Sequence, residues 1–427
     1  MNQQLSRDVY SEESNYWKTV VVVFCLGWTV LWINRTIMNP ILPEIMRDLN
    51  IQSEASAGLI NTLFFLPYTL LQVPCGYWGD KFGRKWVLVP GLILFSCGSI
   101  VAGIATTFTM FLIARVVTGI GQGSYFGPVY ALSSEIIPSN KRGVSTAIIN
   151  SGCALGMAVG MIGSSYLVKD MQWDWRSLMI LSGVIGFGTA FIFQKYLKNT
   201  TPASNKNTAT DSVEDKSTGS LAYMKEYIKN PKLMTASIVY FATCYSHFMV
   251  VTWLPTFLEQ ERGFQGTAIG IASSLVAFSS VPGALIFSRL SDKYSNKKIS
   301  LITFLHIAAA ITLFATVAAK NNIMLIVALI LYGLLGKLAV DPILVSYLAD
   351  ICPKDKMTTT FGLYNFFGMS GSVIAPYITG LISDVTGSKI LGFYLASVLL
   401  IVALGIFLIG NVFIKSKNEE NSNLQVN

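Results

Sequence analysis

The sequence is poor in charged residues, and this shortage excludes an ordinary soluble globular protein. Only 13% of its 427 residues are Asp, Glu, Lys or Arg, whereas soluble domains contain about 25%. Apolar residues make up 52% of the chain, and the mean hydropathy is +0.54. A chain with so few charges cannot solvate its whole surface, so we expect much of that surface to face lipid.

Histidine is also scarce, and cysteine occurs without a metal-binding or disulfide pattern. There are two histidines and six cysteines, and no C-x-x-C pair is present. The cysteines all lie in or beside apolar runs: Cys25, Cys75, Cys97, Cys153, Cys244 and Cys352. We interpret them as small packing residues. We therefore expect no metal site, no cofactor and no enzymatic activity.

The chain is instead dominated by twelve apolar runs of roughly 20 residues, the length that crosses a hydrocarbon core about 30 Å thick. Such a run satisfies its backbone hydrogen bonds in lipid only as a helix. The predicted fold class is therefore an all-α membrane protein with twelve transmembrane helices. The approximate spans are 17–38, 55–77, 86–105, 108–134, 144–168, 176–196, 233–258, 266–289, 299–319, 322–349, 358–383 and 389–414.

The basic residues are distributed unevenly between the loops. If both termini are cytoplasmic, most of the 31 Lys and Arg residues fall in inward-facing segments. Six fall in outward loops: Arg47, Lys169, Arg176, Arg262, Lys320 and Lys389. This asymmetry follows the positive-inside rule and predicts a multi-pass protein of the cell (plasma) membrane with cytoplasmic termini. The net charge of +8 thus reports topology, and with no soluble basic domain we expect no nucleic-acid partner.

A long hydrophilic stretch divides the twelve runs into two groups of six. Its middle is rich in Thr, Ser, Asn and Lys, which is typical of a flexible tether. The polar start of the chain does not match a cleaved signal peptide, so the first helix is expected to stay as an anchor. The expected parts are a cytoplasmic N-terminal segment, an N-terminal six-helix bundle, a cytoplasmic linker, a C-terminal six-helix bundle and a cytoplasmic tail, at 1–16, 17–196, 197–232, 233–414 and 415–427.

The two groups of six resemble each other in sequence. The string Gly76–Lys85 follows the second run, and Ser288–Lys297 follows the eighth in the same frame. Five residues of the first half recur at one constant offset in the second: Gly121, Glu135, Pro138, Asn150 and Gly156 match Gly336, Asp350, Pro353, Asn365 and Gly371. A parallel duplication predicts two bundles related by an axis along the membrane normal, with a binding site between them near the midplane.

The string Gly76–Lys85 fits the signature G-x-x-x-D-[RK]-x-G-R-[RK] at every defined position, and so resembles the major facilitator superfamily. The resemblance implies the major facilitator fold, with two pseudo-symmetric six-helix bundles. Asp80 can cap or pair with the neighbouring bundle, while Arg84 holds the loop on the cytoplasmic side. The signature indicates the superfamily and carries no information about the substrate.

Three further segments resemble the anion:cation symporters, a family that includes hexuronate and aldonate importers and vesicular and lysosomal organic-anion carriers. These segments are Asn34–Pro43, Trp253–Leu258 and Tyr125–Gly143. Organophosphate:phosphate antiporters share much of this framework. The resemblance implies secondary active transport of a small organic anion, such as a sugar acid or another carboxylate, by symport and alternating access.

Four ionisable residues lie well inside apolar runs, where each charge costs at least about 2.5–3.5 kcal/mol and needs a partner or a function. Arg35 lies in the first run and Arg115 in the fourth; the resemblance implies that both helices line the cavity. A guanidinium stays protonated and grips a carboxylate or phosphate with two donors. We predict that the two arginines bind the anionic substrate. Pairing with backbone carbonyls or lipid headgroups is the alternative.

The other two embedded charges, Lys337 and Asp341, are four residues apart and can meet on one helix face. A self-neutralising pair is one interpretation. The repeat, however, places Lys337 at the pseudo-symmetric position of Gln122, facing it across the predicted translocation path. Lys337 is then a third cationic contact to the substrate, with Asp341 tuning it.

Polar side chains complete the candidate site. Tyr68 and Asn365 match residues that the resembled family places in its substrate cavity, although each can equally be hydrogen-bonded core. His247 can titrate near neutral pH, but a lone histidine on an aromatic-rich helix is more often a packing residue. The candidate residues for coupling or gating are Asp341, His247, Asp80 and Arg84.

The chain departs from the resembled family at two positions. Proton-coupled members carry an acidic residue directly before the first arginine and another after the second, where this chain has Asn34 and Gln122. An amide keeps its hydrogen-bonding capacity but cannot take up a proton. Two mechanisms stay open. One is exchange or uniport of an organic anion, such as an organophosphate or dicarboxylate, without proton coupling; the other is symport with Asp341 or His247 as the proton carrier.

Two other functional classes fit the sequence less well. A transporter-like sensor would need an extended docking segment for its partner, and the sequence has none. Efflux of amphipathic drugs would need acids to attract cations, whereas the embedded charge is net positive. The expected partners are a small organic anion, a co-transported proton or sodium ion, and the lipid bilayer, with the carrier acting as a monomer.

Overall fold

The computed structural model describes residues 2–138, 141–198, 223–353 and 357–424. These residues form helices and no strand, which confirms the predicted all-α class. Each of the twelve apolar runs coincides with a helix or with two consecutive helices. Ten helices in the described part of the chain are long and apolar enough to cross a membrane. The middle of the predicted linker and the last residues of the predicted tail lie outside the described ranges.

The structure divides into two compact units. The first comprises Met1–Gln52, Leu59–Asn207 and Leu258–Ala277, and the second comprises Ser53–Gly58, Thr208–Phe257 and Phe278–Asn427. Each unit therefore holds most of one predicted bundle together with a short piece from the other half of the sequence. The bundle boundaries at 17–196 and 233–414 stay predictions.

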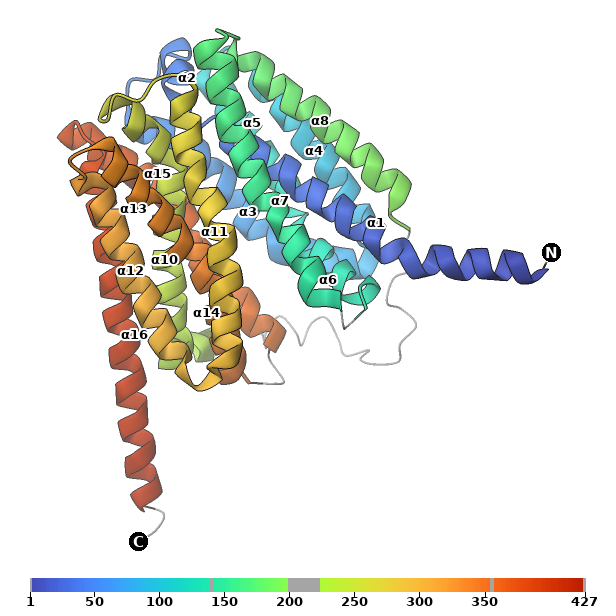
Figure 1. Ribbon diagram of the computed structural model, residues 1–427, viewed down its shortest axis with the longest axis vertical. Coiled ribbons are helices and arrows are strands. Elements are labelled where there is room, and N and C mark those ends of the chain that lie inside the picture. Colours follow the sequence, from blue (N-terminus) through green and yellow to red (C-terminus); the bar gives the residue numbers. More distant parts are fainter. Residues whose placement is uncertain (1, 139–140, 199–222, 354–356, 425–427) are drawn as a thin grey trace. The chain divides into compact units, whose positions relative to one another are not determined.

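The first unit is built from the helices of the first half of the chain. They are α1 (Asn2–Thr36), α2 (Leu42–Asp48), most of α3 (Glu54–Phe82), α4 (Lys85–Gly103), α5 (Phe108–Gly123), α6 (Phe126–Ile136), α7 (Arg142–Ser164), the π-helix η2 (Ser165–Asp170) and α8 (Trp175–Tyr196). Helix α1 packs along α7, and α4 packs against α5 and α8 (Figure 1). The predicted N-terminal segment 1–16 contains no Gly or Pro, so α1 extends through it from Asn2.

Glycines allow α1 and α7 to approach closely. A Cβ atom at Gly152 would lie 2.4 Å from the carbonyl oxygen of Cys25, and one at Gly156 would lie 2.3 Å from that of Thr29. No side chain larger than hydrogen fits at either place. Because lipid gives no hydrophobic drive for association, close van der Waals packing of this kind is one of the main forces that hold membrane helices together.

The second unit is built from the remaining helices, except that the end of α10 from Leu258 and the start of α11 up to Ala277 belong to the first unit. The remaining helices are α10 (Pro231–Gln260), α11 (Thr267–Lys293), the 3-10 helix η3 (Ser295–Lys297), α12 (Lys298–Ala318), α13 (Asn322–Leu335), α14 (Lys337–Ile351), α15 (Met357–Thr386) and α16 (Ile390–Leu424). Helix α12 packs against α13, α14 and α16 (Figure 1). Residues 223–229 of the predicted linker are helical, and the hydroxyl of Tyr223 shares a 2.6 Å hydrogen bond with that of Thr360. Helix α16 also extends through most of the predicted tail, to Leu424.

Two helices that the sequence predicts as continuous are broken. The run at 108–134 forms α5 and α6, which are separated by residues 124–125, and the run at 322–349 forms α13 and α14, which are separated at Gly336. Hydropathy does not report these breaks because each run as a whole stays apolar despite single polar residues such as Gln122 and Lys337. Interrupted membrane helices commonly border the binding sites of transporters.

The two breaks occupy related places in the duplicated sequence. Gln122 stands just before the first break and Lys337 directly after the second. The hydroxyl of Tyr125 donates to the carbonyl oxygen of Phe24 at 2.8 Å, so the first break is held against α1. Both polar side chains thus stand where the backbone leaves regular helix.

The duplication is also visible as a repeated ion pair. In the first unit, Arg84 at the start of α4 contacts Glu135 near the end of α6, with 2.5 Å between Nη1 and Oε2. In the second unit, Lys298 at the start of α12 contacts Asp350 near the end of α14, with 2.5 Å between Nζ and Oδ2. Each pair ties together the ends of two helices within its own unit.

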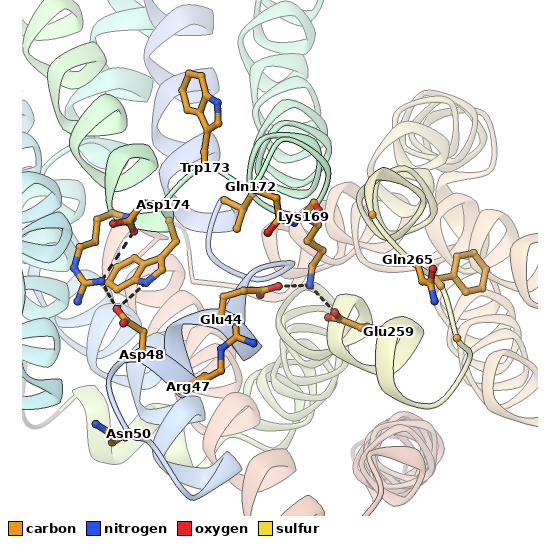
Figure 2. A pocket seen from close by; sticks show the side chains of 16 residues that line it. Glu44, Arg47, Asp48, Asn50, Lys169, Gln172, Trp173, Asp174, Glu259 and Gln265 are labelled. Atoms are coloured by element: carbon orange, nitrogen blue, oxygen red, sulfur yellow. Dashed lines mark hydrogen bonds and ion pairs between the residues drawn. The ribbon is translucent and has the colours of Figure 1, made fainter.

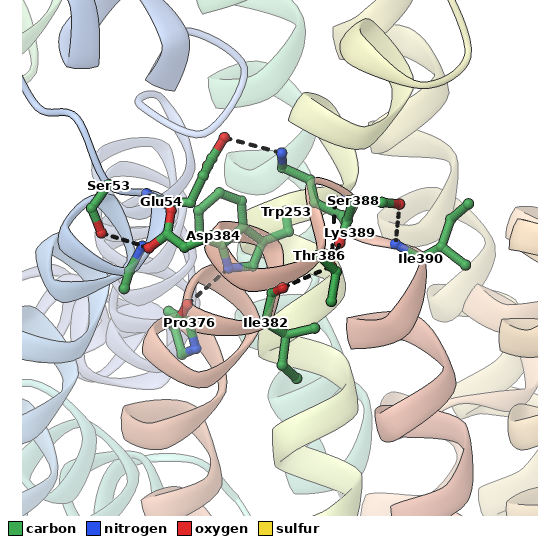
Figure 3. Close-up of polar contacts among 11 residues, drawn as sticks. Ser53, Glu54, Trp253, Pro376, Ile382, Asp384, Thr386, Ser388, Lys389 and Ile390 are labelled. Carbon is green, nitrogen blue, oxygen red and sulfur yellow. Dashed lines mark hydrogen bonds and ion pairs between the residues drawn. The ribbon is translucent and has the colours of Figure 1, made fainter.

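In each unit, an aspartate binds the short piece that comes from the other half of the sequence: Ser53–Gly58 in the second unit and Leu258–Ala277 in the first. In the second unit, Asp384 of α15 accepts the backbone N–H groups of Glu54 and Ala55, at 2.6 and 3.0 Å (Figure 3). In the first unit, Asp170 of η2 accepts the N–H of Thr267 at 3.0 Å. A carboxylate at a helix N-terminus satisfies free N–H groups and meets the positive end of the helix dipole. The starts of α3 and α11 are therefore fixed in the same manner.

Candidate functional site

The first unit brings Arg35 and Arg115 to a common aromatic ring. Arg35 lies in the last turn of α1 and is 4% exposed, and Arg115 lies on α5 and is 1% exposed. The centroid of the Phe64 ring is 5.7 Å from the guanidinium carbon of Arg35 and 4.5 Å from that of Arg115. The two arginines are therefore neighbours in the structure, and their role in binding the substrate stays a prediction.

Aromatic side chains surround the Arg35 guanidinium. Its central carbon lies 4.4 Å from the ring centroid of Tyr68, 5.1 Å from that of Trp32 and 5.6 Å from that of Trp28. The faces of these rings attract a cation, and the attraction strengthens when water is excluded. They lower the cost of burying the charge without neutralising it, so Arg35 keeps its capacity to bind an anion.

A relay of amides and hydroxyls orients Arg35. The Nε–H of Arg35 donates to Oε1 of Gln122 at 2.7 Å, and Nε2 of Gln122 donates to Oδ1 of Asn34 at 3.0 Å. The amide nitrogen of Asn34 then donates to the hydroxyl oxygens of Ser99 and Ser182, at 2.7 and 3.1 Å. Helices α1, α4, α5 and α8 are linked by this chain. Gln122 and Asn34 stand where the resembled family has acidic residues. Gln122 accepts the hydrogen bond from Arg35, and Asn34 orients the amide of Gln122.

Arg115 is held in the same way by neutral amides. Its Nη2 lies 3.5 Å from Oδ1 of Asn61, which is at the limit of a hydrogen bond, and Nδ2 of Asn61 donates to Oδ1 of Asn39 at 3.3 Å. Asn61 is 2% exposed and Asn39 is 1% exposed. Each arginine therefore has a carboxamide oxygen as its side-chain acceptor.

The two guanidiniums carry uncompensated charge. No carboxylate within the described ranges forms an ion pair with Arg35 or Arg115. Nη2 of Arg35 and Nε of Arg115 are buried and make no hydrogen bond to any described residue. A buried donor without a hydrogen-bond partner costs free energy. The arrangement is therefore suited to accept negatively charged oxygen atoms from a ligand.

In the second unit, Lys337 and Asp341 form an ion pair along α14. The ammonium nitrogen of Lys337 also lies 5.5 Å from the ring centroid of Tyr240. The self-neutralising interpretation raised by the sequence therefore describes this pair within its unit. It contributes no net charge.

Asn365 and His247 also lie in the second unit. Asn365 on α15 follows Tyr364, whose ring stacks on that of Tyr240 with 4.6 Å between centroids. His247 on α10 is 6% exposed, and its ring lies 5.3 Å from that of Phe248. His247 is thus buried beside an aromatic ring, and both its packing and its coupling interpretation stay predictions.

The signature motif has a structural role in the first unit. Arg84 pairs with Glu135, and Lys85 donates from Nζ to the carbonyl oxygens of Gln194 and Leu197 at 2.6 and 2.8 Å, which caps the end of α8. The side chain of Asp80 lies outside the described part of the structure. The proposed contact of Asp80 with a neighbouring bundle stays a prediction.

A separate cavity of about 880 Å³ lies in the first unit (Figure 2). Lys169 crosses one side of it, with its Nζ 2.7 Å from Oε1 of Glu44 and 2.6 Å from Oε1 of Glu259. None of the predicted substrate-binding residues lines this cavity. Its acidic and basic side chains largely cancel, so it lacks the net positive charge of the arginine pair.

Seven residues around Arg35 and Arg115 were not anticipated as site residues from the sequence: Trp28, Trp32, Asn39, Asn61, Phe64, Ser99 and Ser182. They became visible only once α1, α3, α4, α5 and α8 were assembled. Small polar and aromatic residues are common in membrane helices, where serines often bond to the backbone of their own helix. Their identity alone therefore gave no signal.

A helical membrane protein with a duplicated half and a buried cationic site within one half has the features of a secondary carrier. The family model described as Major Facilitator Superfamily matches residues 24–376 and 263–424. The chain therefore belongs to the Major Facilitator Superfamily, which confirms the predicted membership and makes it a transporter rather than an enzyme.

Relatives extend over nearly the whole chain. A hexuronate transporter of Bacillus subtilis is 24% identical over 395 residues, covering 90% of this chain and 92% of its own. A probable galactarate/D-glucarate transporter of Escherichia coli is 24% identical over 425 residues, covering 92% and 94%. A probable sulfoacetate transporter of Cupriavidus necator is 23% identical over 393 residues, covering 89% and 90%.

A solved structure has the same fold. The crystal structure of a bacterial homolog to the human lysosomal transporter Spinster, in an inward-facing and occupied conformation, superposes with a TM-score of 0.78. It covers 93% of this chain and 97% of that chain at 15% sequence identity. This similarity supports the major facilitator fold alone.

Proposed function

We propose that this chain transports a small organic anion, such as a sugar acid or another carboxylate, by alternating access. Arg35 and Arg115 bind the anion, and Tyr68 closes the aromatic wall beside Arg35. The observation that carries the proposal is the pair of buried guanidiniums that face one ring without a carboxylate partner among the described residues. Relatives named as a hexuronate transporter and as probable transporters of galactarate/D-glucarate and of sulfoacetate support the same substrate class.

The first test is ligand stabilisation of the purified protein. Thermal shift is used to screen sugar acids, dicarboxylates, sugar phosphates and sulfonates as ligands. Neutral sugars and organic cations at equal ionic strength serve as comparison ligands. We expect the anions alone to raise the melting temperature. The rise should be lost in Arg35→Lys and Arg115→Lys, because the ammonium of lysine cannot reproduce the two-pronged contact of a guanidinium.

A matched control separates this effect from a general loss of positive charge. Arg289 on α11 is exposed, so Arg289→Lys should respond to anions as the unaltered chain does. Stabilisation by cations only, unchanged in Arg35→Ala, would overturn the assignment of an anionic substrate.

A second candidate is exchange or uniport without proton coupling. The observation that favours it is the amide pair: Gln122 and Asn34 serve as acceptor and support for Arg35, and neither can carry a proton. The substrate itself then neutralises the site, and the empty carrier reorients poorly. The alternative, symport of a proton or sodium ion, assigns coupling to Asp341 or His247.

Proteoliposomes distinguish the two mechanisms. For exchange, we expect labelled anion to enter vesicles preloaded with unlabelled anion, whether or not a pH or sodium gradient is present. Empty vesicles with an imposed gradient should then accumulate little label. Gradient-driven accumulation that is lost in Asp341→Asn would favour symport instead.

The setting of the carrier forms part of the proposal. The distribution of Lys and Arg supports cytoplasmic termini in a plasma membrane, and a single chain suffices for the site because one unit supplies both arginines. Reporter fusions at each terminus and light scattering of the purified protein test the topology and the monomeric state.

A further inference from the structure

We infer that the substrate is an organic dianion, with one charge for each of the two arginines. This inference rests on the proposed function and narrows it. The chemical class is a small molecule with two anionic groups, such as a dicarboxylate or a sulfonated carboxylate. A monocarboxylate of the same size would bind less tightly.

The charge balance of the site carries the inference. Arg35 and Arg115 are both buried, and each donates to an amide oxygen, of Gln122 and Asn61 respectively. Carboxylates of similar length at those two places would have cancelled the charges. Lys337 does not change the balance, because its charge is cancelled within the second unit by Asp341.

The proximity of the two guanidiniums makes a single negative charge insufficient. Arg35 and Arg115 contact the same Phe64 ring and interact electrostatically as like charges. A monoanion neutralises one of them and leaves the other buried without a counter-charge. A dianion neutralises both and removes their mutual repulsion, and charge interactions of this kind are strong where water is excluded.

Each guanidinium also has one buried nitrogen without a hydrogen-bond partner among the described residues, Nη2 of Arg35 and Nε of Arg115. The two guanidiniums contact a ring that is fully buried. A ligand with an anionic group at each end can satisfy both donors, whereas a ligand with one such group satisfies them less well. The arrangement thus selects for two acceptors as well as for two charges.

The experiment compares ligands that differ by one charge. D-gluconate and D-glucarate share a six-carbon polyol chain, and at about pH 7.5 they carry one and two ionised carboxylates. Affinities are measured on the purified full chain by titrated thermal shift, and transport is measured by counterflow in proteoliposomes. We expect glucarate to bind at least about tenfold more tightly than gluconate.

Charge variants test whether the preference for a dianion depends on the neutrality of Gln122 and Asn61. Gln122→Glu and Asn61→Asp each add one carboxylate beside one arginine, so each should lose the preference for glucarate and keep binding of gluconate. Gln122→Met removes the same hydrogen bond without adding charge. It should lower the affinities for gluconate and glucarate by a similar factor and leave the ratio of the two affinities unchanged.

The outcomes separate this inference from the function on which it rests. Equal affinity of the unaltered chain for gluconate and glucarate overturns the dianion inference while leaving anion transport intact. An unchanged ligand ratio in both Gln122→Glu and Asn61→Asp also overturns it. If no organic anion binds or is transported, the proposed function itself fails. Should one charge variant not fold, the ligand ratio of the unaltered chain and the other variant still decide.

Discussion

Gln122 accepts a hydrogen bond from the guanidinium of Arg35, with 2.7 Å between Oε1 and Nε. This contact gives the arginine a fixed direction without cancelling its charge. The amide of Gln122 is itself oriented by Asn34, so the direction is set by two side chains that cannot ionise. The two amides at the positions where this chain departs from the resembled family therefore orient Arg35, and because they are neutral they leave its charge uncancelled.

Ser99 and Ser182 anchor the far end of this relay. We expect Ser99→Ala and Ser182→Ala each to lower anion affinity by about threefold to tenfold, since a lost hydrogen bond in such a network costs about 1 kcal/mol. The double variant should lose more anion affinity than either single variant, because neither serine then accepts a hydrogen bond from the amide nitrogen of Asn34. Titrated thermal shift with the best-binding anion measures the effect.

The control for these serines is Ser151 on α7, which is exposed and donates only to the backbone of its own helix. Ser151→Ala should bind the anion as the unaltered chain does. Equal affinity in all three serine variants would show that the relay does not position Arg35.

The ring of Tyr68 lies close to the guanidinium of Arg35. The ring centroid is 4.4 Å from the guanidinium carbon of Arg35, the shortest of the four aromatic contacts of that arginine. We expect Tyr68→Phe to keep most of the anion affinity and Tyr68→Leu to lose it by about fivefold or more, as a buried cation–π contact is worth about 1–2 kcal/mol. A larger loss in the phenylalanine variant than in the leucine variant would instead indicate that the hydroxyl binds the substrate directly.

Hydropathy and charge were sufficient to predict the helices, because the bilayer forces every long apolar run into one conformation. They did not predict the breaks at 124–125 and at Gly336, since a break changes backbone direction without changing polarity. They also did not predict that 1–16 continues α1, because polar residues with helix propensity give no hydropathy signal.

The site was predictable only where its chemistry is rare in a membrane. Arg35 and Arg115 stood out because a buried guanidinium is costly. Ser99, Ser182 and Asn61 did not, since such residues occur throughout membrane helices and their role depends on what the fold places beside them. The charged residues of a site can thus be predicted from sequence, while the direction of their side chains depends on the residues that the assembled helices place beside them.

The glycines of α7 provide a test of packing with an internal control. A Cβ at Gly156 would lie 2.3 Å from the carbonyl oxygen of Thr29, whereas nothing lies within 4 Å of one at Gly163 on the same helix. We expect Gly156→Ala to lower the thermal stability of the purified protein by several degrees, because overpacking costs about 1–3 kcal/mol. Gly163→Ala should leave it unchanged or raise it slightly through helix propensity. The reverse order would contradict the close packing of α1 and α7.

Asp384 provides the last test, at the start of α3. Its carboxylate accepts the N–H groups of Glu54 and Ala55 and the hydroxyl of Ser53, the last at 2.6 Å. We expect Asp384→Ala to accelerate hydrogen exchange at the amides of Glu54 and Ala55 by roughly three- to thirtyfold, as a lost N-terminal cap is worth about 0.5–2 kcal/mol. Asp384→Asn should show a smaller effect, because the amide keeps one oxygen acceptor but loses the charge that favours a helix N-terminus.

The related contact of Asp170 supplies the comparison for this measurement. Asp170→Ala should accelerate exchange at the amide of Thr267, which it bonds at 3.0 Å, and leave Glu54 and Ala55 unaffected. Such site-specific responses would show that each aspartate fixes one helix start independently. Exchange that rises equally at both places in either variant would mean that the two contacts open together, as expected if both must break in the same transport step.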